Sequence, residues 1–323
     1  MKRFKNILLV YDRRVANEST ITRATELARR NEARLTFVEV IEDLPGDLRL
    51  LVSGSSRKSL EEAFLEERAE RLKRMAVSIE QAGLDVETKV LIGTPFLEIV
   101  REVIRHERDL VVLSAEGRGG LKNLLFGSTS MHLMRKCPTP VWVVKPAAER
   151  SDYKNILACI DPSSANGKDA LNIKIMDLAT SLAELEGARL HVVHAWELAG
   201  NDLVTSKSEL PAGTLEEIKL KNRDLHAERV GGLLGNYNLA ALDHEIHLVE
   251  GDPRAVIPEI AQGQSADLIV MGTVCRTGIP GFFIGNIAEE VLIQAECSVL
   301  TVKPEGFRTP SEVTEYVASR PAA

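Results

Sequence analysis

The stretch "FKNILLVYDRR" at Phe4–Arg14 returns as "YKNILACIDPS" at Tyr153–Ser163, and this repetition decides the fold. In each copy a short apolar run ends at a polar segment that begins with an aspartate, Asp12 or Asp161. Such a run is typical of a strand covered on both faces, as in a parallel sheet flanked by helices. Two such first strands in one chain indicate two copies of one domain.

The similarity continues in the same order through both halves of the chain. The segment "EARLTFVEVIE" returns as "GARLHVVHAWE", "ERDLVVLSAEGRGG" as "SADLIVMGTVCRTG", and "CPTPVWVVKP" as "CSVLTVKP". Matches in one shared order are difficult to obtain by chance. We therefore predict a first domain at residues 1–147, a second at 152–306 and a C-terminal tail at 307–323.

Within each copy, apolar runs alternate with segments of helical period. The first copy has runs typical of strands at residues 7–10, 35–40, 86–92, 110–113 and 141–144. Helices are expected between them, with capping boxes at Ser59–Glu62 and Thr214–Glu217 and first-turn prolines at Pro95 and Pro253. Pro258 should kink the helix that contains it. The alternation predicts an α/β protein of two tandem doubly wound domains, each with a five-stranded parallel sheet.

The composition narrows the class of protein. A chain of 323 residues with 44% hydrophobic residues can bury two cores, and a net charge of -7 disfavours nucleic acid as a partner. The four cysteines are far apart and form no C-x-x-C pair, as in a reduced compartment. The apolar run near the amino terminus is too short for a signal peptide or a membrane span. We expect a cytoplasmic protein that contacts neither nucleic acid nor membrane.

Candidate binding residues follow the strands at which the sheet order should reverse. Ligands of doubly wound sheets bind beyond the carboxyl ends of these strands. Asp12 and Asp161 follow the first strands, and the glycine-bearing segments 114–128 and 272–286 follow the fourth. Each segment leads into a helix, whose free N–H groups and positive dipole end can receive phosphate. The sequence predicts one such crevice in each copy.

At these residues the chain resembles the universal stress protein family, and its two-copy layout resembles the family's tandem members. The resemblance covers nearly the whole chain and implies an adenine nucleotide alpha hydrolase-like fold. It also implies a regulatory or protective role in the stress response. ATP or a related adenine nucleotide is the implied ligand of at least one domain, with Mg²⁺ as its accompanying ion. A pseudo-two-fold pairing of the domains through residues 141–144 and 299–302 is implied as well, and a homodimer of whole chains stays open.

The family's nucleotide-binding members carry a glycine, two residues, a second glycine, nine residues, and then glycine followed by Ser or Thr. Each copy here departs from that pattern at one of the first two glycines, and Asn replaces the hydroxyl residue in the second. The first copy has Ser114, Gly117, Gly127 and Ser128 at these positions. The second has Gly272, Cys275, Gly285 and Asn286. The resemblance further implies that Asp12 and Asp161 contact the adenine, together with the residues that close the second strands, Val40 and Ala195.

Several alternatives stay open at this point. The glycines are also explained by tight strand-to-helix turns, and the two aspartates by capping of the following helices. A slow ATP-hydrolysing enzyme would use Asp12 or Asp161 as its acidic group, and a carrier would hold a hydrophobic ligand between the copies. No catalytic residue is assigned, and Cys275 is read as a small core side chain.

Two histidine pairs raise the question of a metal site. His191 and His194 lie three residues apart, as do His244 and His247. Residues at this spacing on a strand point to opposite faces, so neither pair can bind one ion. The sequence therefore predicts no metal site.

Overall fold

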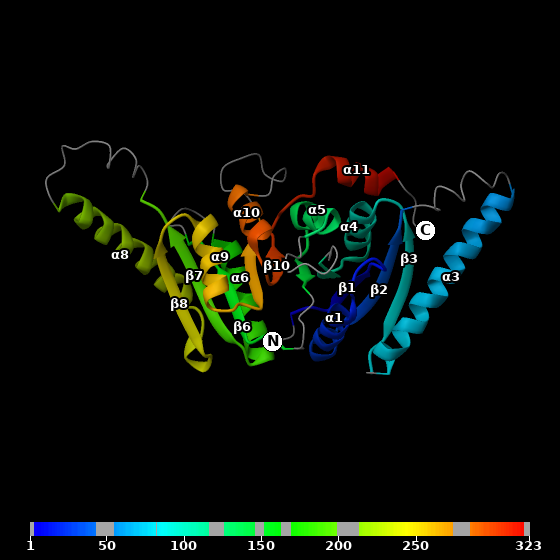
Figure 1. The fold of residues 1–323 in the computed structure, drawn as a ribbon, viewed down its shortest axis with the longest axis horizontal. Helices are drawn as coiled ribbons and strands as arrows, with labels where there is room; N and C mark the ends of the chain where they lie inside the picture. Colours follow the sequence, from blue (N-terminus) through cyan, green and yellow to red (C-terminus); the bar gives the residue numbers. More distant parts are fainter. Residues whose placement is uncertain are drawn as a thin grey trace. The chain divides into compact units, whose positions relative to one another are not determined.

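The computed structural model describes residues 3–42, 55–81, 83–115, 126–145, 152–162, 169–198, 213–273 and 285–319. The chain divides into two compact units. The first contains Met1–Ser151 and Phe307–Ala323, and most of Asp152–Gly306 forms the second. Figure 1 shows helices on both sides of the strands within each unit.

The first unit has five parallel strands in the order β3-β2-β1-β4-β5. They are β1 (Asn6–Tyr11), β2 (Arg34–Ile41), β3 (Val86–Ile92), β4 (Leu110–Ser114) and β5 (Val141–Val144). Its helices before the second unit begins are α1 (Glu18–Asn31), α3 (Ser55–Glu80), α4 (Pro95–His106) and α5 (Ser128–Lys136). The strand order reverses between β1 and β4, which is where a doubly wound sheet offers a ligand site.

The second unit repeats this topology, with strand order β8-β7-β6-β9-β10 and parallel pairing throughout. Its strands are β6 (Asn155–Cys159), β7 (Arg189–Trp196), β8 (His244–Glu250), β9 (Leu268–Gly272) and β10 (Ser298–Val302). Its helices are α6 (Asp169–Glu186), α8 (Thr214–Leu234), the short 3-10 helix η1 (Leu239–Ala241), α9 (Pro253–Gly263) and α10 (Asn286–Gln294). Two tandem, doubly wound, five-stranded parallel domains are thus confirmed.

The apolar runs form the cores because helices cover both faces of the strands. Ile7, Leu8 and Leu9 of β1 are fully buried, as are Leu110 and Val111 of β4. Consecutive residues of one strand point to opposite faces. Burial of every residue in a run therefore requires a layer on each side, as the sequence predicts.

Both predicted capping boxes are wrong. Helix α3 begins at Ser55, so Ser59 lies inside it. Helix α8 begins at Thr214, and its N-cap is Gly213, whose φ of 87° places it in the left-handed region. A hydroxyl inside a helix cannot cap its free N–H groups, so the first pattern does not mark the start of α3. The second pattern marks the start of α8 to within one residue, but the cap is Gly213 and not Thr214.

The prolines of α9 have separate roles. Pro253 lies in the first turn, as Pro95 does in α4. Pro258 lies inside α9, which continues through it to Gly263. Because Pro258 has no N–H to offer the carbonyl of Arg254 one turn earlier, that acceptor would lack its helical partner. The side-chain amide of Gln294 in α10 donates to the Arg254 carbonyl at 3.3 Å and supplies the missing hydrogen bond.

The predicted C-terminal tail contains a helix, α11 (Ser311–Ser319), that belongs to the first unit. The Tyr316 hydroxyl donates to Glu98 Oε1 of α4 at 2.7 Å. Glu98 is 2% exposed and also binds Arg101 at 3.0 Å. Val313 of α11 is buried as well. The last segment of the chain is therefore part of the first unit's packing.

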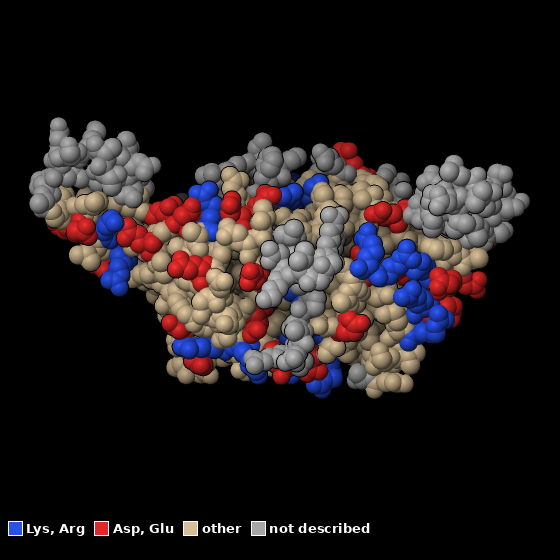
Figure 2. Space-filling view, in the orientation of Figure 1, with Lys and Arg blue, Asp and Glu red and all other residues tan. Residues whose placement is uncertain are grey.

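The surface charge and the character of the helices bear on what the protein can contact. Figure 2 shows basic side chains beside acidic ones over the described part of one face. Among the described helices, none combines the length and apolar character that a membrane crossing requires.

Candidate ligand-binding site

Asp12 follows directly after β1, and two neighbours hold it in place. Arg14 donates to the Asp12 carboxylate from Nε at 2.9 Å and from Nη2 at 2.7 Å. The backbone N–H of Arg14 donates to the same carboxylate at 2.9 Å. Asn17, the N-cap of α1, donates from its side-chain amide to the Asp12 carbonyl at 2.8 Å. Asp12 is thus five residues before the cap of α1, so it does not cap that helix itself.

The charge of Asp12 is balanced by Arg14. Burial by itself would raise the pKa of the Asp12 carboxyl, but the hydrogen bonds and charge of Arg14 outweigh it and lower this pKa below its ordinary value. The carboxylate is ionised at neutral pH, and the guanidinium beside it reduces its repulsion of an incoming anion.

A pocket opens beside Asp12 at the carboxyl ends of β1 and β4. It encloses about 440 Å³, a figure that includes its opening to solvent. Apolar side chains, the Asp12–Arg14 pair and four hydroxyl-bearing residues form its wall. The lining residues are Val10, Tyr11, Asp12, Arg14, Val40, Pro95, Ile99, Leu113, Ser114, Thr129 and Ser130.

The start of α5 supplies Thr129 and Ser130 and free backbone donors. Gly127 is the N-cap, and the first helical hydrogen bond runs from Met131 N to the Gly127 carbonyl at 2.9 Å. The N–H groups of Ser128, Thr129 and Ser130 precede that bond and have no partner within the helix. They lie at the positive end of the helix dipole, which favours an anion.

The glycines at the two helix starts are not required by backbone conformation. Gly127 has φ of -71° and Gly285 has φ of -62°, values that any residue adopts. A tight turn therefore does not by itself explain glycine at either position. Absence of a side chain leaves the helix start open to a group outside the chain.

Packing explains the first position of the glycine pattern in both units. In the first unit, the Ser114 hydroxyl lies 2.7 Å from Thr20 Oγ1 and donates to Asn17 Oδ1 at 3.2 Å. In the second unit, a Cβ on Gly272 would lie 2.7 Å from Leu171 Cδ2. Ser114 and Gly272 both contact the helix that follows the first strand of their unit. The residue type at the first glycine position therefore depends on packing against that helix.

The second unit brings its predicted residues to the corresponding strand ends. Asp161 follows β6, and Asn172 of α6 holds its backbone by hydrogen bonds of 2.9 and 3.0 Å. Its carboxylate lies 3.8 Å from His194 Nδ1. Burial, with smaller contributions from His226 and Arg229, lowers the pKa of His194 to about 4, so this imidazole is neutral at pH 7.

The remaining predicted residues of the second unit are placed as follows. Ala195 lies on β7, Gly272 ends β9, and Gly285 and Asn286 begin α10. The Gly285 N–H donates to the carbonyl of Thr273 at 3.1 Å, which holds the helix start against the end of β9. Gly117 and Cys275 both lie outside the described residues.

Sequence reasoning identified only part of the first-unit pocket. The sequence predicted Asp12, Val40 and Ser114 as binding residues, and all three line the pocket. It missed Arg14, although a basic residue two positions after an aspartate was visible. It also missed Asn17 and Asn172, because they follow their aspartates at different distances and do not align between the copies.

The fold and site define a class: a tandem α/β protein with a candidate ligand crevice where the strand order reverses. The sequence model of the universal stress protein family matches residues 3–145 and 152–303. The chain belongs to the universal stress protein family, and it carries two of its domains in tandem.

Curated relatives match over the whole length. The chain is 29% identical to universal stress protein E of Escherichia coli K12 over 317 residues, which covers 98% of this chain and 99% of the relative. It is 28% identical to universal stress protein E of Salmonella typhi over 318 residues, with the same coverage. Membership in this family supports a role in the stress response.

Solved structures share the fold. A functionally unknown protein from Pseudomonas aeruginosa PAO1 aligns with a TM-score of 0.73 and 22% identity over 99% of both chains. A universal stress protein from Archaeoglobus fulgidus aligns with a TM-score of 0.61 and 18% identity, over 93% of this chain and 98% of its own. Pairing of the two domains through residues 141–144 and 299–302 stays a prediction, as does association of whole chains.

Proposed function

We propose that the first unit binds ATP or a related adenine nucleotide in the pocket beside Asp12, and that the protein acts in the stress response as a regulatory or protective binder. The observation that carries this proposal is the composition of one pocket wall. Apolar side chains, an ion pair and the open start of α5 face the same space. These are the surfaces that a base, a ribose and a phosphate require.

Each part of the nucleotide has a counterpart in the wall. Val40 and Pro95, the partly exposed apolar residues of the lining, offer a surface for the flat face of a base. The Asp12 carboxylate is an acceptor for base or ribose donors. The N–H groups and hydroxyls of Thr129 and Ser130 offer donors to phosphate.

The electrostatics favour binding over turnover. A general base works best when its pKa lies near the operating pH. Arg14 lowers the pKa of Asp12, which takes this carboxylate further from that condition. A bound nucleotide would then act by stabilising the unit that holds it.

The two copies supply a matched test. Thermal unfolding is measured with and without ATP and Mg²⁺, alongside an assay for released phosphate. Ligand at 100 times its Kd stabilises a protein by about 2.7 kcal/mol, which corresponds to a midpoint rise of roughly 5–11 °C for a domain of this size. We expect that rise for the native chain, without phosphate release.

The variants Asp12→Asn and Asp161→Asn locate the site. Loss of hydrogen bonds to a charged group should weaken binding roughly tenfold or more in Asp12→Asn. Asp161→Asn, its counterpart in the second unit, should bind as the native chain does. The reverse result would place the site in the second unit, and phosphate release that disappears in Asp12→Asn would identify an enzyme. No response to any adenine nucleotide would refute the proposal.

A further inference from the structure

Two histidines that the sequence separates meet across neighbouring strands of the second unit. On β7 and β8, His191 is in register with Glu245, and Val193 is in register with His247. Side chains two apart on a strand share a face, so His191, Glu245 and His247 all lie on one face. This explains why the sequence prediction of no metal site overlooked them. It considered pairs within one strand and not pairs between strands.

The donor atoms of these three side chains converge. His191 Nδ1 lies 3.1 Å from His247 Nε2 and 3.9 Å from Glu245 Oε2. All three donor atoms lie within 4.8 Å of one another. In a tetrahedral zinc site with Zn–N bonds of about 2.0–2.1 Å, two ligand nitrogens are roughly 3.3 Å apart. The spacing of the two imidazole nitrogens is therefore that of a chelating pair.

A supporting residue orients the buried imidazole. His191 is 1% exposed, and its Nε2 lies 3.4 Å from Asn155 Oδ1. A proton on Nε2 that is donated to this carbonyl oxygen leaves the lone pair of Nδ1 facing His247 and Glu245. Ligating histidines usually have such a partner on the second ring nitrogen. His247 and Glu245 are only partly buried, which leaves a path for an ion.

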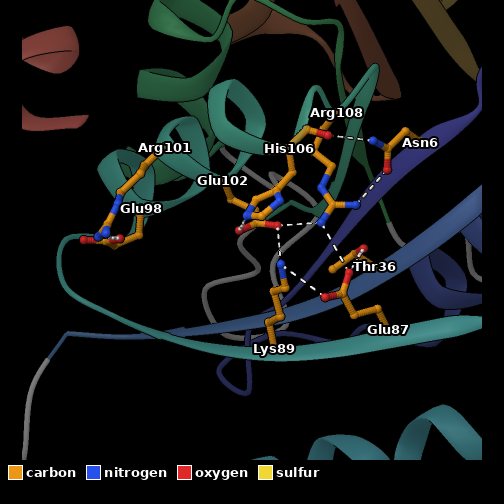
Figure 3. Close-up of polar contacts among 9 residues, drawn as sticks. All are labelled: Asn6, Thr36, Glu87, Lys89, Glu98, Arg101, Glu102, His106 and Arg108. Carbon is orange, nitrogen blue, oxygen red and sulfur yellow. Dashed lines mark hydrogen bonds and ion pairs between the residues drawn. The ribbon is translucent and has the colours of Figure 1, made fainter. Parts of the chain in front are cut away.

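The first unit holds a positive charge at the corresponding place. By strand register, Thr36, Glu87 and Lys89 correspond to His191, Glu245 and His247. Figure 3 shows Lys89 between the carboxylates of two glutamates. Lys89 Nζ lies 3.2 Å from Glu87 Oε1 and 3.1 Å from Oε1 of Glu102, a residue of α4. In the first unit, the side chain of Lys89 thus places a positive charge beside Glu87.

The second unit lacks the residues that complete this network. His247 replaces Lys89, and the positions of Glu102 and Arg108 are occupied by Ile260 and Ala266. What remains is a carboxylate with two imidazoles, a donor set that suits zinc and related divalent ions.

Arg189 is a basic side chain in contact with this set. Its Nη2 lies 3.0 Å from Glu245 Oε2, while its Nε lies 3.4 Å from Asp243 Oδ1. If Glu245 binds a metal ion, Arg189 therefore still has the Asp243 carboxylate as an acceptor.

We propose that His191, Glu245 and His247 bind a divalent transition-metal ion of the Zn²⁺ type, with solvent as the fourth ligand. The site lies near the amino ends of β7 and β8, whereas the candidate nucleotide residues lie at carboxyl ends. The ion would fasten β8, the last strand in its unit's order, to β7. This proposal is independent of nucleotide binding.

Titration with the metal alone tests the site. The full chain is freed of metal with a chelator, kept reduced, and titrated with Zn²⁺ by calorimetry and with Co²⁺ by visible absorption. We expect one ion per chain with micromolar or tighter affinity, a Co²⁺ spectrum of nitrogen and oxygen ligation, and a higher midpoint of thermal unfolding.

Three variants distinguish this site from other ligands. His247→Ala and Glu245→Gln change partly exposed residues and should weaken binding by more than the roughly 10- to 100-fold that loss of a supporting hydrogen bond costs. His244→Ala is the matched control, because His244 lies three residues from His247 on the same strand and contacts the Leu242 carbonyl instead. It should bind as the native chain does.

Two results would overturn the proposal. Absence of Zn²⁺ and Co²⁺ binding would show that His191 and His247 form only a hydrogen bond. Binding that persists in His247→Ala, or a Co²⁺ spectrum with thiolate bands, would assign the ion to other residues.

Discussion

Replacement of Arg108 by methionine should destabilise the first unit severely. The Arg108 side chain is 2% exposed. Its Nη2 lies 2.6 Å from Glu102 Oε1 and 3.5 Å from Glu87 Oε2, and its Nη1 donates to Asn6 Oδ1 at 2.7 Å (Figure 3). The methionine would fill much of the space while removing the charge and these hydrogen bonds.

The magnitude follows from the burial of the partner that remains. The side chain of Glu102 is 6% exposed, and it would keep its ion pair with Lys89. Removal of one partner from a buried ion pair costs about 3–5 kcal/mol when the remaining charge is left unpaired. Because Lys89 still contacts Glu102, we expect a loss of about 3 kcal/mol or less. With a urea dependence of about 2 kcal/mol per molar, the midpoint of unfolding should fall by roughly 1–1.5 M.

The assay uses the two tryptophans of the chain. Trp142 is 1% exposed in β5 of the first unit, and Trp196 lies in β7 of the second. In a Trp196→Phe background, urea unfolding followed by fluorescence reports the first unit alone. This separation is needed because a protein of two domains need not unfold in one step.

Two further variants make the experiment decisive. Lys73→Met removes an exposed ion pair with Glu70 and should change nothing measurable. Glu102→Ile combined with Arg108→Ala copies the second unit and should recover part of the loss, since both charges leave together. A shift in Arg108→Met no larger than that of Lys73→Met would refute the account of this network.

Three more predictions concern other parts of the fold. The pKa of His194 is about 4 in the folded chain and near 6.5 in the unfolded chain, so the unfolded chain binds more protons between these pH values. The second unit should therefore lose stability as the pH falls from about 6.5 to 4, as measured by urea unfolding at each pH. The loss should be smaller in His194→Gln. Gly272→Ala places a Cβ against Leu171 and should cost the second unit about 1–3 kcal/mol in the same assay, with part regained in Gly272→Ala/Leu171→Ala. Tyr316→Phe removes a hydrogen bond to the buried Glu98 carboxylate and should weaken docking of α11 by roughly 1.5–3 kcal/mol, seen as faster hydrogen exchange in that helix.

Each of these has a result that counts against it. A stability profile of equal slope in His194→Gln would assign the acid sensitivity to other groups. Full stability of Gly272→Ala would show that Leu171 moves aside without cost. Unchanged exchange in Tyr316→Phe would mean that apolar contacts such as that of Val313 hold α11 alone.

Local patterns predicted the strands better than the helix ends. Strand β5 has the bounds that its apolar run predicts, Val141–Val144. Strand β3 also has its predicted bounds, Val86–Ile92, although polar residues interrupt it. An apolar run between covering helices has one stable arrangement, so it is informative by itself. Neither capping box identified the N-cap, because a hydroxyl residue with a glutamate three positions later also occurs within helices.

The candidate site was predicted in position but not in detail. Placement of Asp12 and Ser114 at one sheet edge follows from the topology alone. The contact of Ser114 with Thr20, 94 residues earlier in the chain, depends on how α1 packs on β4. From the sequence, Ser114 is only a departure from the glycine pattern. In the structure it is a residue that packs against α1.

By itself, the sequence determined that one domain occurs twice, that its strands and helices alternate, and that two aspartates follow the first strands. These features depend on residues close together in the chain. Only the tertiary structure decided that His191 meets His247, 56 residues away, and that Gln294 supports the helix containing Pro258. Side-chain alternation sets the face of a residue within its strand, but the residue it meets is set by strand register and helix packing, which act between distant segments.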